Sequence, residues 1–527
     1  MTKIIKKNYE VVIVGAGPCG TTAANILGKY NIDTLVIDKE PDIVNIPRAV
    51  GMCEEGSRIM DLVGVLDDPI MDFRLINKIH FLDKNQDSLF HADTYEPNNG
   101  YSIIRTFHQP DLEKSLRRAM DGHDCVQLLT STELIDFNDK GEGVELTIKQ
   151  GDETSVIHCQ YLLACDGASS PVRKKLNISF EGDTYPQDWM IIDIENSPVL
   201  SSEGAFTINP ERPSITLPGP GKRRRWEFVV KEHDDPEMLF KPENLQELLK
   251  GWGDIEDLQV SRKAVYTFHA RTAGQYRANN VFLLGDAAHI TPPFAGQGMM
   301  AGMRDAHNLA WKLSAVLKNQ LKPKVLETYQ SERLPQSYQV IKFAQYIGGV
   351  VLPQNNLVAG IRNSIIRLLG LLGVHSETKG MPLDKVHNHI NGNYIKCRII
   401  SKIFNTGVEF PQHKLVKDNK KLLSDKLISE DFHIIGMNIN PAHYLTEKTL
   451  SRWRSMLGKE TIITDDKNKP EQEELLLDEK GQYKKLFKSG KNLVVVRPDK
   501  MMVLHCTIKN LDKKLNKYMD AVGCTLS

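Results

Sequence analysis

The sequence predicts an α/β protein, and three patterns support this class. An uninterrupted apolar run at 11–14 leads through a glycine-rich turn and a helix to a second apolar run at 34–37. Residues 180–270 carry several strand-like runs, and β and α patterns alternate again from about residue 407. Because uninterrupted apolar strands are typical of parallel sheets covered on both faces, we expect such a sheet in the N-terminal part of the chain.

The N-terminal segment predicts a β-α-β unit of about 30 residues. Residues 11–14 form its first strand, 21–29 its helix and 34–37 its second strand, which ends at Asp38. The turn between the first strand and the helix holds the glycines that are analysed below. A unit of this kind is a common scaffold for binding a nucleotide at the helix N-terminus.

Further elements follow in order along the chain. Short alternating runs at 71–105 predict strands, and Pro110 lies near the start of a helix expected at 109–120. The other expected elements are three strands within 126–166, strands at 189–194, 226–230, 264–268 and 281–284, a helix at 298–317, more helices to about 375, and a small α/β region with elements at 432–435, 450–456, 461–464, 493–497, 501–505 and 511–519.

Gly15, Gly17 and Gly20 form a GxGxxG motif between the first strand and its helix. In such a motif the first glycine permits the tight turn, the second lets the backbone approach a pyrophosphate, and the third lets helix and strand pack closely. Asp38 lies near the spacing of about 20 residues that is expected for an acid that binds a ribose. Together these features predict a dinucleotide site.

A second glycine-rich segment lies far along the chain. The apolar run at 281–284 ends in Gly285 and Asp286, and Pro292 and Pro293 stiffen the turn that follows. The run at 296–298, Gly-Gln-Gly, leaves unobstructed backbone at the start of the next helix. The N-terminus of that helix is suited to stabilise negative charge on an electron-rich ring.

Three motifs in this order resemble the signatures of the FAD-dependent aromatic hydroxylases, the group A flavoprotein monooxygenases. They are GxGxxG at 15–20, LLACDGASSPVR at 162–173 and GDAAH at 285–289. Within that family the sequence is most similar to the 3-(3-hydroxyphenyl)propionate hydroxylases, through the stretches at 47–50, 189–193, 266–271 and 292–299. The resemblance covers the whole chain.

The resemblance implies three domains. They are a discontinuous Rossmann-like FAD-binding domain (1–72, 100–180 and 272–375), a β-rich substrate-binding domain (73–99 and 181–271), and, after a linker at 376–406, a thioredoxin-like α/β domain at 407–527. No cysteine pair in the chain has CxxC spacing, so we expect the last domain to have a structural or oligomeric role.

The resemblance also assigns residues to the cofactor. Asp38 is expected to bind the adenosine ribose, Asp286 the ribityl chain, and Arg48 and Gln109, with Arg105 nearby, the pyrophosphate and ribityl regions. Asp166 and Gly167 belong to a motif linked to both FAD and the nicotinamide nucleotide. The remaining cofactor-binding candidates are Gly15, Gly17, Gly20, Gly285, Pro293, Gly296, Gly298, Met299 and Met300.

The implied reaction uses NADPH or NADH to reduce FAD, and O2 then forms a flavin C4a-hydroperoxide that hydroxylates an aromatic ring. A 3-(3-hydroxyphenyl)propionate-like phenol is the expected substrate. A phenol becomes more nucleophilic when it is deprotonated, so a base or acceptor is expected near its hydroxyl. His269 and Tyr185 are the candidates, with a purely structural role as the alternative for His269, and Arg271 is a candidate for a substrate carboxylate.

Other functions stay open at this point. A monooxygenase of polycyclic or antibiotic substrates would share every FAD motif, and a non-catalytic FAD-fold binding protein would keep the fold alone. The absence of a closely spaced cysteine pair disfavours a disulfide reductase. Lys222 to Arg225 follow a Pro-Gly-Pro-Gly run and are expected to form an exposed turn, with phosphate binding for NADPH as the alternative.

The charge balance excludes further classes. With 67 basic and 67 acidic side chains the net charge is zero, which argues against a nucleic-acid partner bound by counterion release. No stretch of about 20 apolar residues predicts a membrane span. We therefore expect a cytoplasmic enzyme with no membrane partner and no metal site, and the resemblance implies a homodimer.

Overall fold

The computed structural model describes residues 6–94, 100–252, 258–352, 356–371, 407–466, 475–487 and 490–526. The predicted linker at 376–406 lies outside the described residues. The described chain forms two compact units, one of residues 6–25, 34–304 and 337–371 and one of residues 26–33, 305–336 and 407–526. The α/β class is confirmed in both units, whereas the predicted three-domain boundaries remain a prediction.

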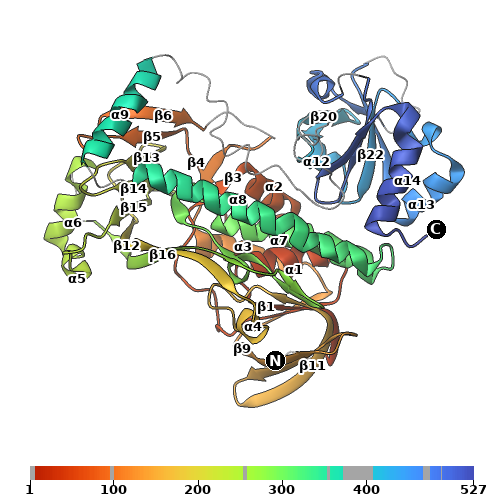
Figure 1. Ribbon diagram of the computed structural model, residues 1–527, viewed down its shortest axis with the longest axis horizontal. Helices are drawn as coiled ribbons and strands as arrows, with labels where there is room; N and C mark the ends of the chain where they lie inside the picture. Colours follow the sequence, from red (N-terminus) through yellow and green to blue (C-terminus); the bar gives the residue numbers. More distant parts are fainter. Residues whose placement is uncertain are drawn as a thin grey trace. The chain divides into compact units, whose positions relative to one another are not determined.

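The first unit contains a mainly parallel sheet with the strand order β17-β18-β11-β1-β2-β8 (Figure 1). Strands β18, β11, β1, β2 and β8 are parallel, and β9 and β10 extend β11 as antiparallel neighbours. The strand bounds are β1 (Asn8–Val14), β2 (Thr34–Ile37), β8 (Val126–Leu129), β9 (Thr132–Asp139), β10 (Val144–Gln150), β11 (Glu153–Ala164), β17 (Arg277–Ala278) and β18 (Val281–Leu283).

Three motifs meet at one edge of this sheet. Strands β1, β11 and β18 are parallel neighbours and end at Val14, Ala164 and Leu283. Gly15, Asp166 and Gly285 follow directly or within two residues. The carboxyl ends of parallel strands are where open α/β sheets bind ligands, so the fold brings the three sequence motifs to one candidate site.

Helices pack beside this sheet edge. Helix α1 (Pro18–Lys29) begins with a proline, and α3 (Gln109–Met120) and α7 (Gly298–Leu317) follow later in the chain. The Asn25 amide of α1 donates to the Leu116 carbonyl of α3 over 2.9 Å, and Cys19 of α1 donates to the Gly302 carbonyl of α7 over 3.2 Å. Figure 1 shows the three helices gathered near β1. The expected helices at 109–120 and 298–317 are confirmed.

The second sheet of this unit has the order β19-β16-β12-β15-β14-β13-β5-β6 and is antiparallel except for the β13–β5 pair. Its strands are β5 (Lys78–Leu82), β6 (Ser88–Asp93), β12 (Phe180–Ile194), β13 (Glu203–Thr207), β14 (Ser214–Pro218), β15 (Arg224–Val229), β16 (Val260–Ala273) and β19 (His289–Ile290). A small third sheet has the order β3-β7-β4, from Gly51–Cys53, Ile104–Thr106 and Arg74–Leu75.

The two faces of the second sheet have different partners, because side chains alternate along a strand. One face packs Met190, Ile192, Trp226 and Phe228 against helix α6 (Pro242–Leu249). The opposite face carries Trp189, Ile215 and Val229, which pack around Phe294. We call this second face the site face, because Phe294 directly follows Pro293 of the second glycine-rich segment.

The second unit contains a sheet of order β21-β20-β24-β23-β22-β25-β26. β22 and β23 are parallel, β25 is antiparallel to β22, and β26 is antiparallel to β25. This is the predicted thioredoxin-like arrangement. The elements are β20 (Lys414–Lys417), β21 (Lys420–Leu423), α12 (Ser424–Leu427), β22 (Phe432–Met437), α13 (Glu447–Ser455), β23 (Gly458–Thr464), β24 (Leu475–Leu477), β25 (Leu493–Val496), β26 (Met502–Cys506) and α14 (Leu511–Val522).

The thioredoxin-like sheet carries no reactive dithiol among its described residues. The stretch after β22, residues 438–446, contains no cysteine. Burial raises the pKa of the Cys506 thiol to about 11, so this side chain stays protonated at neutral pH. The Cys506 side chain is therefore a buried apolar packing group of the sheet.

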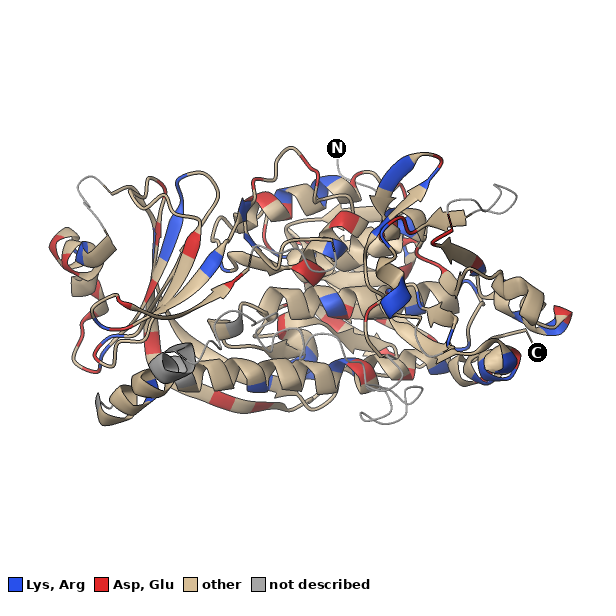
Figure 2. Ribbon diagram, turned by 90° about the horizontal axis from the view of Figure 1, so that it is seen from above, with Lys and Arg blue, Asp and Glu red and all other residues tan. Residues whose placement is uncertain are grey.

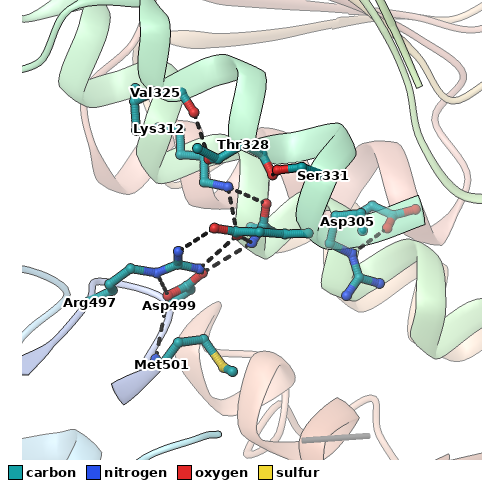
Figure 3. Close-up of polar contacts among 11 residues, drawn as sticks. Asp305, Lys312, Val325, Thr328, Ser331, Arg497, Asp499 and Met501 are labelled. Carbon is teal, nitrogen blue, oxygen red and sulfur yellow. Dashed lines mark hydrogen bonds and ion pairs between the residues drawn. The ribbon is translucent and has the colours of Figure 1, made fainter. Parts of the chain in front are cut away.

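A buried cluster of charges lies within the second unit (Figure 3). Glu332, on α8 (Glu327–Val351), accepts hydrogen bonds from Arg497 Nη1 at 2.7 Å and Nη2 at 3.0 Å and from Lys312 Nζ at 2.9 Å. Arg497 also donates to both carboxylate oxygens of Asp499. The four charged side chains are at most 4% exposed. Because each has an oppositely charged partner, the cluster joins α7 and α8 to the chain that follows β25.

Charged residues of both signs occur throughout the described elements (Figure 2). Among the described helices, we find none with the combination of length and apolar composition that a membrane-spanning helix requires.

Candidate active site

The glycine turn after β1 combines tight packing with open space. Gly15 has φ +105°, and a Cβ there would collide with the Cys165 carbonyl. A Cβ on Gly20 would collide with the carbonyl oxygen of Gly15. By contrast, nothing lies within 4 Å of the position of a Cβ on Gly17. The first and third glycines are thus required by the protein itself, while the second leaves room at the N-terminus of α1, where a pyrophosphate would need it.

Asp38 is held against this turn. Its Oδ2 accepts a hydrogen bond from the Ala16 backbone N–H at 2.6 Å, and its Oδ1 accepts one from the Glu40 N–H at 2.9 Å. An ionised carboxylate has about four lone-pair positions, so acceptor capacity remains. The carboxylate is therefore fixed at the end of β2 and can accept hydroxyl groups of a ribose.

Asp166 and Gly167 lie beside the glycine turn. Asp166 Oδ2 accepts from the Val172 N–H at 3.1 Å, whereas its buried Oδ1 has no hydrogen-bond partner within the described chain. Burial raises the pKa of this carboxyl. Arg173 donates to the carbonyls of Ala168 and Ala287, both at 2.8 Å. This arginine therefore ties the second motif to the third.

Gly285 and Asp286 form a short 3-10 turn, Gly285–Ala287, at the end of β18. Gly285 has φ +58°, and a Cβ there would lie 3.2 Å from the Cys19 sulfur. The Asp286 side chain is exposed but recessed, and the surrounding protein raises the pKa of its carboxyl although His289 and Arg48 act against that shift. Asp286 is thus an exposed acid at the end of β18, at the sheet edge where the three motifs meet.

Gln109 positions the chain that carries Arg48. Its Oε1 accepts from the backbone N–H groups of Arg48 at 2.9 Å and Ala49 at 2.7 Å, and its Nε2 donates to Glu113 at 2.8 Å. The Arg48 side chain is exposed. Arg105 packs over the Phe73 ring, and its buried Nε has no hydrogen-bond partner in the described residues. The structure thus gives Gln109 a clear role in holding the backbone of residues 48–49.

A second device, which we call the arginine clamp, holds the same backbone from the site face. Arg225 donates from Nη1 to the Arg48 carbonyl at 2.8 Å and from Nη2 to the Pro47 carbonyl, which also accepts from Arg262. Asp193 takes a bidentate bond from Arg225, at 2.6 and 2.8 Å. The expectation of an exposed turn at Lys222–Arg225 is wrong for its second half, because Arg224 and Arg225 begin β15 and are 2% and 4% exposed.

Replacing Arg225 with alanine is expected to raise the dissociation constant of the nucleotide cofactor about 10- to 100-fold. The substitution removes charge-assisted hydrogen bonds, worth about 1.5–3 kcal/mol each, that hold the Pro47 and Arg48 carbonyls. Fluorescence titration of the apoprotein with cofactor measures the effect. Arg223, whose pair with Glu195 is partly exposed, is the matched control, and Arg223→Ala should change little. Equal constants for Arg225→Ala and wild type would contradict the clamp.

An aromatic cluster surrounds Phe294 on the site face. Its ring centroid lies 5.6 Å from Tyr185, 5.7 Å from Trp189 and 5.8 Å from Phe268, all in edge-on geometry. Ile347, on α8, packs against the same cluster. Edge-to-face contacts at these distances favour a rigid apolar wall. Trp189 and Phe294 are buried, whereas Tyr185 and Phe268 are partly exposed, so these two rings can offer an apolar surface to an aromatic ring beside the turn at Pro293.

The structure separates the two predicted catalytic side chains. Tyr185 belongs to the aromatic cluster, and burial raises the pKa of its hydroxyl. His269 lies next to Phe268 on β16, so it points to the opposite face, where its Nδ1 contacts Thr184 Oγ1 at 3.0 Å. Arg271 donates to the same hydroxyl at 2.9 Å. His269 and Arg271 are therefore not brought together with the aromatic wall.

The start of α7 is held by contacts that the sequence did not reveal. Gly296 has φ +61°, which makes the turn before the helix. Arg304 pairs with the buried Glu55 and donates to Gln297 Oε1 at 2.8 Å. Met300 is 1% exposed and packs against Gly56 of α2 (Glu54–Leu62). Gly298 and Met299 are partly exposed at the helix start. The backbone of this helix start, rather than the Met300 side chain, is thus open.

Comparisons with known proteins agree with this geometry. Residues 8–344 match the family model of the FAD binding domain, and residues 407–521 match that of the HcaD C-terminal domain. A protein of Escherichia coli strain K12, named 3-(3-hydroxy-phenyl)propionate/3-hydroxycinnamic acid hydroxylase, is 30% identical over 99% of this chain and 96% of its own length.

This chain belongs to the FAD-dependent aromatic hydroxylases. Like the other members, it is a flavoprotein monooxygenase. Among solved structures, the hydroxylase has the fold of the flavin-dependent monooxygenase PieE (TM-score 0.80, 16% identity, 98% of this chain and 99% of that chain). It also has the fold of aklavinone-11 hydroxylase (TM-score 0.78, 20% identity, 98% and 100%).

Proposed function

We propose that this hydroxylase uses NADPH or NADH and O2 to hydroxylate a small phenol of the 3-(3-hydroxyphenyl)propionate class. The observation that carries the proposal is the aromatic wall of Tyr185, Trp189, Phe268 and Phe294 beside the Pro293 turn. An apolar, aromatic-lined site with few polar groups fits a single phenyl ring. The full-length similarity to the Escherichia coli hydroxylase supports the same substrate class.

We propose that FAD lies along the edge where the three motifs meet. The free space at Gly17, the fixed Asp38 carboxylate and the orphaned polar atoms of Asp166 and Arg105 fit a dinucleotide. The pyrophosphate would lie at the N-terminus of α1, and the flavin ring along the open backbone from Pro293. The full proposed set is Gly15, Gly17, Gly20, Asp38, Arg48, Arg105, Gln109, Asp166, Gly167, Gly285, Asp286, Pro293, Gly296, Gly298, Met299 and Met300.

When bound, FAD supplies the oxygen chemistry, which no side chain of the protein can provide. The protein's own residues bind and orient. Gln109 and the arginine clamp hold the backbone of residues 47–49, and Arg304 with Glu55 holds the turn before α7. The aromatic wall keeps one face of the substrate dry, which limits wasteful side reactions with water.

A second substrate class has a specific observation in its favour. The solved structure of aklavinone-11 hydroxylase, a complex with FAD and aklavinone, matches this hydroxylase over 98% of its length. At 20% identity this likeness shows a shared fold and not a shared substrate. The side chains that line the substrate site would decide between a polycyclic and a single-ring substrate. The homodimer and the cytoplasmic location expected from the sequence stay predictions.

A substrate panel tests the proposal. Purified holoenzyme is given NADPH or NADH in air with 3-(3-hydroxyphenyl)propionate, 3-hydroxycinnamate, aklavinone or 3-phenylpropionate, which lacks the hydroxyl. We expect nicotinamide oxidation matched by a product one oxygen heavier for the two single-ring phenols only. Turnover of aklavinone without turnover of the small phenols would replace the proposed substrate class with the polycyclic one.

A further inference from the structure

Glu227 is a buried acid on the site face that no hydrogen bond from the described residues holds. It lies on β15 between Arg225 and Val229, and because side chains alternate, all three share one face. Val229 packs in the cluster around Phe294, and Arg225 holds the Pro47 and Arg48 carbonyls. Glu227 is 7% exposed. With a rise of about 3.4 Å per residue, it stands about 7 Å along the strand from each neighbour.

The cross-strand neighbours of Glu227 are apolar. Glu227 is paired with Ile191 on β12 and with Ile215 on β14, and these are 6% and 5% exposed. Directly opposite residues of antiparallel strands point to the same side. Glu227 is thus the acid in an apolar strip that runs from the aromatic wall to the arginine clamp.

The carboxylate of Glu227 has no hydrogen bond within the described part of the chain. Its nearest cation is Arg225 Nη1, at 3.9 Å. Arg225 makes its bidentate bond to Asp193, and Arg262 lies 3.6 Å from the same aspartate, so Glu227 is the second negative charge beside these two arginines, although neither arginine donates a hydrogen bond to it. A buried carboxylate without hydrogen bonds costs several kcal/mol in solvation. A group kept at that cost, on the same sheet face as the aromatic wall, is a candidate for function.

We propose that Glu227 is the acceptor for the phenolic hydroxyl of the substrate. The ring would lie against the aromatic wall, with its hydroxyl toward the carboxylate. When the O–H bond breaks, the proton passes to a Glu227 oxygen and the electron pair stays on the phenolate, whose ring is then a better nucleophile. This inference rests on the proposed phenolic substrate.

The charges around Glu227 suit this role. Burial raises the pKa of its carboxyl, Arg225 and Arg262 act to lower it, and Asp193 acts to raise it further. Tyr266, on β16, accepts a hydrogen bond from Arg262. On the other side of Glu227, the neighbouring residue on β14 is the apolar Ile215. An acid with a raised pKa is a stronger base than an ordinary glutamate once ionised. Tyr185, whose pKa is also raised, stays protonated and can serve only as a hydrogen-bond donor or neutral acceptor at neutral pH.

The test compares Glu227→Gln with wild-type holoenzyme, using two probes. Glutamine keeps the shape and removes the base. For 3-(3-hydroxyphenyl)propionate we expect product formation to fall about 10²- to 10⁴-fold, the range typical of general-base catalysis. The dissociation constant, read from the perturbed flavin spectrum, should rise about tenfold. For 3-phenylpropionate, which has no hydroxyl, the dissociation constant should stay unchanged. Glu227→Asp should restore part of the activity.

Other outcomes have distinct meanings. If Glu227 only balances the charge of Arg225, the glutamine variant will lose FAD or shift both probes equally, and the inference is overturned. Unchanged turnover of the phenol by the variant overturns it as well. If the wild-type enzyme neither binds nor hydroxylates a phenol, the proposed substrate class is wrong, and the role of Glu227 falls with it. Asp193→Asn is the control, because it loosens the arginine clamp and leaves Glu227 in place. This variant should bind FAD more weakly, and any change in dissociation constant should be the same for 3-(3-hydroxyphenyl)propionate and 3-phenylpropionate.

Discussion

Replacing Gly17 with alanine is expected to weaken FAD binding by this hydroxylase while leaving the protein folded. The methyl group meets no atom within 4 Å in the protein, and Gly17 has no positive φ to strain. It would instead fill the space that the pyrophosphate needs. Overpacking of about 1–3 kcal/mol corresponds to a rise of about 10- to 100-fold in the dissociation constant for FAD. Fluorescence titration with FAD and thermal unfolding of the apoprotein measure the two effects.

Gly20→Ala is the matched comparison. Here the methyl group collides with the Gly15 carbonyl, so the backbone of the turn must move. We expect this variant to lose both FAD affinity and thermal stability, even without cofactor. A Gly17→Ala protein that purifies yellow with wild-type affinity would show that the pyrophosphate does not approach Gly17.

Replacing Arg497 with methionine should lower the free energy of unfolding by about 3–5 kcal/mol, the usual cost of breaking a buried ion pair. The change leaves Glu332 with Lys312 and the Asn308 amide as its hydrogen-bond donors, and it removes the bidentate partner of Asp499. Arg454→Met in the same unit is the control. Arg454 is 59% exposed in its pair with Glu460, and such pairs contribute about 0–1 kcal/mol. Urea unfolding measures the free energy of unfolding of both variants. Equal losses of stability in Arg497→Met and Arg454→Met would contradict a stabilising role of the buried cluster.

The effect of Arg497→Met should also depend on pH. Burial alone would raise the pKa of the Glu332 carboxyl, but Arg497 and Lys312 outweigh it and hold the pKa well below its usual range. A carboxyl whose pKa is lowered on folding stabilises the protein above its unfolded pKa of about 4.3 and loses this contribution at lower pH. The difference in free energy of unfolding between wild type and Arg497→Met should therefore become smaller as the pH falls below about 4.

Local motifs were predictable because their partners lie close in the sequence. The strand, turn and helix around Gly15, Gly17 and Gly20 follow each other directly, and Asp38 ends the next strand. The helix at 109–120 was also predictable, because its proline marks the start. These features depend on backbone conformation and on apolar runs, which a single sequence displays.

The arginine clamp and Glu227 were not predictable, because their meaning depends on distant partners. Arg225 can be buried because Asp193 and the Pro47 carbonyl accept its hydrogen bonds. These two partners lie 32 and 178 residues away in the sequence. Without those partners a run of four basic residues predicts an exposed turn. The predicted strand at 226–230 was found, but the sequence did not show that it begins two residues earlier, at Arg224.

His269 shows how the position in a strand limits a guess from residue type. A histidine next to aromatic residues suggests acid–base chemistry, but Phe268 occupies the site face and alternation turns His269 away. The strand at Thr132–Asp139 was missed for a related reason. Only Thr132 and Phe137 of this strand are buried, so its apolar signal is weak, and its pairing with β10 is visible only in the structure.

The most direct test of phenol hydroxylation by this flavoprotein is the rate of flavin reduction in single-turnover mixing. Anaerobic holoenzyme is mixed with NADPH or NADH, with and without 3-(3-hydroxyphenyl)propionate, and oxygen is then admitted. We predict that the phenol accelerates reduction at least about tenfold, equal to ~1.4 kcal/mol of barrier, and that the reoxidised mixture contains the hydroxylated phenol. Reduction at the same rate with and without the phenol, and recovery of the phenol unchanged, would contradict the account.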